Sequence, residues 1–210
     1  EITSTDPNDP AIVEATVIDG SGSGSVVSFR NAEGRYARLT GLTIQNGDHG
    51  IYCLGQDTAP TISRCRVISN KTGILCDLAS PLISFSTIAD NAQDGIAHSW
   101  GVIRNCTIQD NGEYGTRDCR GRVEQCAIGG NGQGGMWKPQ GSVKNALIHG
   151  NLGNGVDYPG DDHDVRVCSI SNCTIVGNKG HGMALDFDDD TRVDIENSII
   201  VLNTGAGIYR

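Results

Sequence analysis

Short apolar segments recur along the chain about every 20 residues, separated by glycine and asparagine. In each repeat a small residue comes three positions after the first apolar residue, and a second apolar residue comes two positions later. The first apolar position holds Leu39, Ile62, Ile83, Ile103, Val123, Val143, Ile170 and Ile195. The second holds Ile44, Val67, Ile88, Ile108, Ile128, Ile148, Ile175 and Ile200. Next comes an asparagine: Asn46, Asn70, Asn91, Asn111, Asn131, Asn151, Asn178 and Asn203. A glycine ends the frame: Gly50, Gly73, Gly95, Gly115, Gly135, Gly155, Gly182 and Gly207.

This regular spacing indicates a repeat architecture. No segment carries apolar residues at helical spacing over the length of a helix, which disfavours a helical solenoid. Apolar positions two residues apart, flanked by glycine and asparagine, are typical of short strands and tight turns. One repeat has room for three short strands, and stacked repeats would pair at roughly 4.8 Å. The pattern therefore predicts an all-β solenoid.

The frame I-x-x-C-x-I-x-x-N-x-x-x-G-I resembles the repeat of right-handed parallel β-helix proteins, the pectate-lyase-like superfamily. It covers about 170 of the 210 residues. The resemblance implies a ladder of stacked asparagines in one turn, an extracellular or cell-surface setting, and frequent action on acidic polysaccharides. Many members of the superfamily have no catalytic activity, so the fold does not identify the function.

The chain length fits a single parallel β-helix domain over residues 1–210, with about nine to ten rungs of three short strands. Residues 1–38 are less regular, and residues 39–210 carry the regular repeats. Asp6–Pro10 is expected to form a loop, and Val26, Val27 and Phe29 to supply a strand. Neither end has the polar cap that a solenoid end needs, so we expect a fragment of a longer protein.

Composition narrows the set of partners. The formal net charge of −9 argues against nucleic acid and anionic membrane surfaces, although a local basic strip or a bridging cation would still bind a polyanion. No apolar run reaches transmembrane length, so membrane insertion is not expected. The high glycine content, with 29 glycines, is attributed to turns that need positive φ.

Eight cysteines invite a disulfide interpretation, but the repeat argues for another one. Four of them occupy the small inward position: Cys65, Cys106, Cys126 and Cys173. Buried free cysteine behaves as a small apolar residue, so mostly unpaired core thiols are predicted. The alternative is a Cys53–Cys76 or Cys106–Cys126 bridge between adjacent rungs.

Two acidic loops follow the glycine strands of consecutive long repeats. Their candidate metal ligands are Asp157, Asp161, Asp162, Asp186, Asp188 and Asp189. Because the repeats are consecutive, the loops should lie side by side, where the carboxylates repel one another unless cations or water screen them. Dense carboxylate oxygens suit Ca²⁺, so a calcium site is predicted. The alternatives are carboxylates for acid–base chemistry on a sugar and an ordinary solvated acidic surface.

In the resembling enzymes, the strand after the glycine lines the substrate groove. Here that strand would present five candidate substrate-binding residues: Asp94, Tyr114, Arg117, Trp137 and Asp157. Exposed tyrosine and tryptophan stack on sugar rings, and arginine pairs with a uronate carboxylate or acts as a lyase base. The candidate catalytic residues are Arg117, Asp157 and His181. The alternative is an ordinary mixed sheet surface.

His181 also belongs to a second resemblance. Gly160-Asp-Asp followed by Gly180-His-Gly is similar to the "GDD … GHG" pair of polygalacturonase-type glycosidases. The two aspartates fall six to seven residues too late in the repeat, and the N-T-D and R-I-K elements of that family are absent. His181 is therefore expected to be a surface residue beside a turn.

One more column places His98, Asp118 and Lys138 on consecutive rungs. Strand alternation would point them inward, which is costly for charged groups. Either they pair with one another at a strand end, or the strand has already ended and they are exposed.

The favoured hypothesis is an extracellular β-helix module that interacts with polysaccharide, with uronate-containing polymers as candidate ligands. The first alternative is a polysaccharide lyase or glycoside hydrolase with its groove on the post-glycine strand. The second is a non-catalytic structural or adhesive solenoid.

Overall fold

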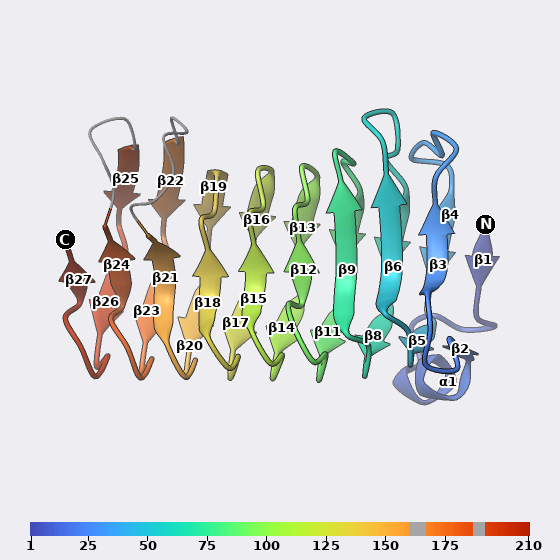
Figure 1. Cartoon of the computed structure of the whole chain (residues 1–210), viewed down its shortest axis with the longest axis horizontal. Coiled ribbons are helices and arrows are strands. Elements are labelled where there is room, and N and C mark those ends of the chain that lie inside the picture. Colours follow the sequence, from blue (N-terminus) through green and yellow to red (C-terminus); the bar gives the residue numbers. More distant parts are fainter. Residues whose placement is uncertain (160–166, 187–191) are drawn as a thin grey trace.

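The computed structural model describes residues 1–159, 167–186 and 192–210, and these residues coil into stacked rungs of parallel strands (Figure 1). Each rung contributes one strand to each of three sheets, and every strand pairs with its equivalents on neighbouring rungs. Over the described residues each sheet contains nine strands, which makes about eight full turns, slightly fewer than the nine to ten rungs predicted. The predicted right-handed parallel β-helix with three strands per rung is confirmed.

The three sheets form three walls that run the length of the coil. Sheet A contains β1 (Ile2–Thr3), β4 (Arg38–Thr40), β7 (Thr61–Ser63), β10 (Leu82–Ser84), β13 (Val102–Arg104), β16 (Arg122–Glu124), β19 (Gly141–Lys144), β22 (Val167–Ser171) and β25 (Arg192–Glu196). Sheet B contains β2 (Val17–Asp19), β5 (Thr43–Gln45), β8 (Arg66–Ile68), β11 (Thr87–Ala89), β14 (Thr107–Gln109), β17 (Ala127–Gly129), β20 (Leu147–His149), β23 (Thr174–Val176) and β26 (Ile199–Val201). Sheet C contains β3 (Ser25–Phe29), β6 (His49–Leu54), β9 (Thr72–Asp77), β12 (Ile96–Ala97), β15 (Tyr114–Arg117), β18 (Gly134–Trp137), β21 (Asn154–Tyr158), β24 (Met183–Leu185) and β27 (Ile208–Tyr209).

The apolar columns of the repeat form the core. Ile83 pairs in register with Ile103 in sheet A, and Ile88 pairs with Ile108 in sheet B. These isoleucines are at most 1% exposed. Burial of such a side chain stabilises the fold by roughly 1.5–3 kcal/mol. The columns read from the sequence are therefore the inward stacks of the solenoid.

A short helix, α1 (Pro10–Ala15), interrupts the first rung between β1 and β2. The Asp9 carboxylate accepts a hydrogen bond from the Ala11 N–H and caps the helix, while Pro10 occupies its first turn. The helix is too short for an apolar period, which is why only a loop was predicted at Asp6–Pro10. The strand predicted around Val26–Phe29 is confirmed as β3. This helix lacks the length and apolar character of a membrane span, and it is the one helix among the described residues.

All eight cysteines lie in described segments, and each is buried and free, so the prediction of unpaired core thiols is confirmed. The Cys106 Sγ donates to the Arg104 carbonyl oxygen at 3.3 Å, which satisfies it locally. Burial raises the pKa of the Cys65 and Cys168 thiols to about 11 and that of Cys119 to about 12. These thiols stay protonated at neutral pH and are poor nucleophiles.

The predicted asparagine ladder lies in the turns between sheet B and sheet C. Each side-chain Nδ2 donates to the Oδ1 of the next rung, at 2.9 Å for Asn91 to Asn111 and 2.8 Å for Asn151 to Asn178. Asn46 is an exception, because it is exposed and donates instead to Asp19 at 2.7 Å. The ladder position in that rung is taken by Gly47, whose N–H donates to Asn70 Oδ1 at 3.0 Å. Assigning Asn46 to the ladder column was therefore wrong.

The repeat glycines also differ from expectation. None of the eight adopts positive φ. Most of the positive-φ turn positions hold other residues, such as Asn105 (φ 52°) and Gln125 (φ 54°). The attribution of glycine content to left-handed turns was wrong for these positions. Glycine is required there because a side chain would clash with neighbouring atoms.

Candidate functional site

The outer face of sheet C carries the polar strip expected from the sequence. Arg117 pairs in register with Trp137, and Trp137 pairs with Asp157. The residues before them, Thr116, Met136 and Val156, point inward and are at most 1% exposed. Strand alternation therefore places these three polar and aromatic side chains on the outside, on consecutive rungs about 4.8 Å apart.

Arg117 is the centre of a charged network. Its Nε lies 2.6 Å from Asp94 Oδ2, and its Nη2 lies 2.7 Å from Glu113 Oε2. The other Asp94 oxygen accepts the Tyr114 N–H at 3.0 Å. Burial opposes the charged form of Arg117, but the hydrogen bonds and charges of Asp94 and Glu113 outweigh it and raise the pKa of the guanidinium. Arg117 is therefore a fixed cation at this surface.

Two aromatic rings lie next to this guanidinium and next to each other. The Tyr114 and Trp137 ring centroids lie 5.0 Å apart at an interplanar angle of 51°. The Arg117 Cζ lies 5.0 Å from the Tyr114 centroid and 5.6 Å from that of Trp137. Such cation–π contacts hold the planar guanidinium in one orientation. The name Arg117 cluster is used below for Asp94, Glu113, Tyr114, Arg117, Trp137 and Asp157.

Asp157 joins the Arg117 cluster through Tyr114. Its Oδ2 accepts a hydrogen bond from the Tyr114 hydroxyl at 3.4 Å. Burial raises the pKa of the Asp157 carboxyl, against the hydrogen bonds from Asn154 and Tyr114, and burial also raises the pKa of the Tyr114 hydroxyl. Asp94 and Tyr114 are each only 6% exposed. The surface available to a ligand therefore consists of Glu113, Arg117, Trp137 and Asp157.

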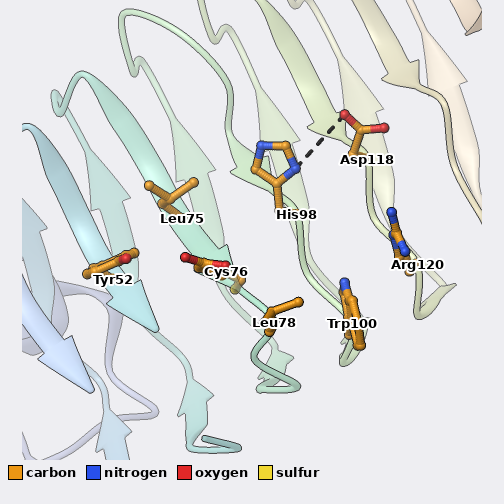
Figure 2. Close-up of a pocket in the computed structure, with 9 residues that line it drawn as sticks. Tyr52, Leu75, Cys76, Leu78, His98, Trp100, Asp118 and Arg120 are labelled. Carbon is orange, nitrogen blue, oxygen red and sulfur yellow. Dashed lines mark ion pairs between the residues drawn. The ribbon is translucent and has the colours of Figure 1, made fainter. Parts of the chain in front are cut away.

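A cleft of about 530 Å³ opens beside the Arg117 cluster, at the ends of β6, β9, β12 and β15 (Figure 2). Trp100 and Arg120 form one wall, with the Arg120 Cζ 5.4 Å from the Trp100 ring centroid. Trp100 is 37% exposed, so part of its ring faces solvent. The name Trp100 cleft is used below for the cavity lined by Tyr52, Leu75, His98, Trp100, Asp118 and Arg120.

The sequence left open whether His98, Asp118 and Lys138 pair with one another at a strand end or lie exposed beyond it. The structure combines the two. Each follows the last residue of its strand and adopts positive φ, at 58°, 46° and 44°. His98 is exposed, and its Nδ1 lies 3.9 Å from Asp118 Oδ2 at the mouth of the Trp100 cleft (Figure 2). Lys138 is 6% exposed, with its Nζ 5.6 Å from the Trp137 ring centroid.

Sequence reasoning missed Trp100, Arg120 and Glu113. Trp100 and Arg120 occupy the same offset in consecutive 20-residue repeats, just beyond the strand. Comparing turn positions across repeats, as well as strand positions, would have brought this pair together.

His181 lies one rung beyond Asp157, beside the turn before β24. Its Nδ1 accepts the Ala206 N–H at 2.9 Å, and its ring stacks on Tyr209 with centroids 4.6 Å apart. The backbone N–H of His181 donates to Asn154 Oδ1 at 2.7 Å. These contacts hold the His181 ring against the last rung, at Ala206 and Tyr209.

Four of the six predicted calcium ligands, Asp161, Asp162, Asp188 and Asp189, lie outside the described residues. Asp157 belongs to the Arg117 cluster, and Asp186 is exposed just after β24. Within the described segments, no three His, Cys, Asp or Glu side chains converge to hold a metal ion. The calcium site stays a prediction.

Comparison with known families agrees with the geometry. The family described as "Right handed beta helix region" matches residues 3–142, about two thirds of the chain. Neither the search of curated proteins nor the search of solved structures found a significant match. With three parallel sheets, an asparagine ladder and this match, the chain belongs to the right-handed β-helix family.

Proposed function

We propose that this chain is an extracellular or cell-surface module that binds polysaccharide along the outer face of sheet C. The observation that carries the proposal is the arrangement of Arg117 and Trp137 on consecutive rungs, next to the Trp100 cleft. Half-exposed aromatic rings bind the apolar faces of sugars, and arginine pairs with carboxylates. Uronate-containing polymers match both features.

The length of the surface also supports a polymer as ligand. The row runs from Tyr52 through Leu75, Ala97 and Arg117 to Trp137, with each residue in register with the next. A solenoid presents such a row without interruption because each rung repeats the last. A chain of sugars could therefore contact several rungs at once.

Trp137→Ala is expected to weaken binding of a uronate polymer such as polygalacturonate by about tenfold, because ring stacking on sugar would be lost. Isothermal titration calorimetry with polygalacturonate oligosaccharides measures the change, and a neutral glucan tests the contribution of charge. The control is Leu147→Ala, which removes a 40% exposed apolar side chain from sheet B. Equal affinity in the two variants would contradict the proposal.

The Asp157 carboxyl supports a second candidate, a lyase or glycoside hydrolase. Its raised pKa and its hydrogen bond from Tyr114 are typical of groups that transfer protons. The other two carboxylates of the cluster, Asp94 and Glu113, both pair with Arg117. The same oligosaccharides distinguish the functions: unsaturated product seen by ultraviolet absorbance indicates a lyase, new reducing ends alone indicate a hydrolase, and binding without either indicates a module.

The calcium hypothesis belongs to the same proposal. Bound Ca²⁺ would stabilise the native state by a free energy that grows with the logarithm of the Ca²⁺ concentration above Kd, about 2.7 kcal/mol at one hundred times Kd. Thermal melts with and without millimolar Ca²⁺ are expected to show a higher Tm with the ion, and Mg²⁺ serves as the control. Identical melting temperatures would rule out the site.

A further inference from the structure

Two adjoining clefts on the sheet A side of the solenoid are lined by arginines. One, of about 500 Å³, is bordered by Arg35, Arg38, Arg64 and Arg104, and the other, of about 310 Å³, by Arg64 and Arg66. The clefts share Arg64 and Phe85. The name arginine surface is used below for Arg35, Arg38, Arg64, Arg66 and Arg104. Four of these arginines lie on or near β4, β7 and β13 of sheet A, and Arg66 begins β8 of sheet B, so the surface is on a different side of the solenoid from the Arg117 cluster on sheet C.

The charge of this surface is uncompensated. None of the described residues lining either cleft is acidic, although the whole chain has a net charge of −9. Across the described segments none of the five guanidinium groups makes an ion pair with a carboxylate. The Arg66 Nε is buried without a hydrogen-bond partner. A bound anion would offset the cost of that buried donor, and the other four arginines are exposed, so their charges face a ligand in solution.

The nearest carboxylates are engaged elsewhere or lie at the margins. Glu124 follows Arg104 in the same row but lies 3.8 Å from Arg122. Asp6 and Asp9 each accept a backbone N–H two residues ahead at 2.9 Å. Glu1 precedes Ile2, which pairs with Leu39, so Glu1 flanks only the Arg38 end. Among the described residues, the charged side chains at the centre of the surface are therefore arginines.

The arrangement suits an extended ligand with several anionic groups. Arg38 on β4 and Arg104 on β13 are separated by three rung spacings, about 14 Å. Between them the cleft is lined by the hydroxyl-bearing residues Thr61, Ser63 and Ser84. Arginines at the two ends would hold anionic groups, and the hydroxyls would hydrogen-bond to neutral polar groups between them.

The hydroxyl groups between the arginines favour a glycan, whose own hydroxyls can donate hydrogen bonds to them, over a nucleic acid, whose backbone presents phosphates. Two aromatic rings also border the cleft: Tyr36, which is 84% exposed, and Phe85, whose ring centroid lies 5.1 Å from the Arg64 Cζ. The exposed Tyr36 ring can pack on the apolar face of a sugar. We propose that the arginine surface binds an anionic polysaccharide through its sulfate or carboxylate groups. This second binding surface uses no residue of the Arg117 cluster or the Trp100 cleft.

The test is calorimetric titration of the whole chain with a heparin-derived oligosaccharide and with an oligogalacturonate, at two salt concentrations. Binding of either ligand identifies the anionic group. The double variant Arg38→Gln, Arg104→Gln is expected to weaken binding about tenfold and to lower the salt dependence by about one unit per arginine. The control is Arg122→Gln, which removes one positive charge from sheet A, from a 61% exposed side chain beside Glu124. Its charge-matched counterparts are the single variants Arg38→Gln and Arg104→Gln, each of which should weaken binding more than Arg122→Gln does.

The variants separate this proposal from the function proposed for sheet C. Trp137→Ala should leave binding at the arginine surface unchanged, and the double variant should leave binding at the Arg117 cluster unchanged. The inference is overturned if the chain binds neither ligand at the arginine surface, if Arg122→Gln weakens binding as much as the double variant, or if single-stranded DNA binds more tightly than both glycans. Unchanged melting temperatures would show that the substitutions leave the fold intact.

Discussion

Asn131→Ala is expected to destabilise the solenoid by about 3–5 kcal/mol, because a fully buried side chain with several hydrogen bonds is lost. The Asn131 Oδ1 accepts from the Asn111 backbone N–H at 3.1 Å and from Asn111 Nδ2 at 3.0 Å. Its own Nδ2 donates to Asn151 Oδ1 at 2.9 Å and to the Ile108 carbonyl oxygen. Alanine would leave two buried donors without an acceptor, and water has no access to replace it.

Urea denaturation followed by circular dichroism measures this loss. The control is Gln109→Ala, which removes an exposed amide from β14 of the preceding rung and should change the free energy of unfolding by less than about 0.5 kcal/mol. If Asn131→Ala unfolds at the same urea concentration as the control, the ladder does not stabilise the fold as described.

Gly115→Ala is expected to cost about 3 kcal/mol or to prevent folding, because the added methyl group has no space. A Cβ at Gly115 would lie 2.5 Å from Ile128 Cγ2, 2.8 Å from the Gly135 carbonyl oxygen and 2.9 Å from Asn131 Nδ2. These atoms belong to a packed isoleucine, a strand and the asparagine ladder. None can move without breaking the stacking between rungs.

Thermal denaturation and expression level of Gly115→Ala test this expectation. Gly34→Ala is the matched control, because a Cβ there meets nothing within 4 Å and its φ is not in the left-handed range. It should be neutral or stabilise by about 0.4–1 kcal/mol, since alanine restricts the unfolded chain. A Gly115→Ala protein as stable as Gly34→Ala would contradict the steric argument.

The two predictions explain why asparagine and glycine keep a fixed spacing in the repeat. The glycine of one rung lies against the ladder asparagine of the next, as Gly95 does against Asn111 and Gly115 against Asn131. The spacing was visible in the sequence, but its reason was misjudged as turn geometry. Glycine is required because the ladder asparagine and its neighbours fill the space beside it. Asparagine is required because its side chain makes the ladder hydrogen bonds.

The fold could be predicted well because core packing repeats. An inward position in one rung stacks on the same position in the next, so the order of apolar residues specifies the strand register. The irregular parts of the chain could not be predicted from this repetition. Helix α1 is only six residues long. Asn46 comes two residues after Ile44, whereas the ladder asparagines come three residues after the second apolar position, so Gly47 occupies the ladder position in that rung.

Outward side chains are less constrained, and the candidate sites depend on them. The sequence placed Arg117, Trp137 and Asp157 in one row because alternation along a strand is regular. It did not indicate that Arg117 would be held by Asp94 and Glu113. Those contacts depend on side-chain direction and length, which no repeat pattern encodes.

The sequence by itself determined the solenoid, the register of its core columns, the unpaired cysteines and the direction of the sheet C row, because burial forces those positions to repeat. Only the tertiary structure decided which surface residues meet. The Trp100 cleft and the arginine surface join turn and strand residues from several rungs, and a shared offset such as that of Trp100 and Arg120 does not show which side chains meet. Solvent-facing positions are free of core packing, so their partners are set by the coiling of the chain in space.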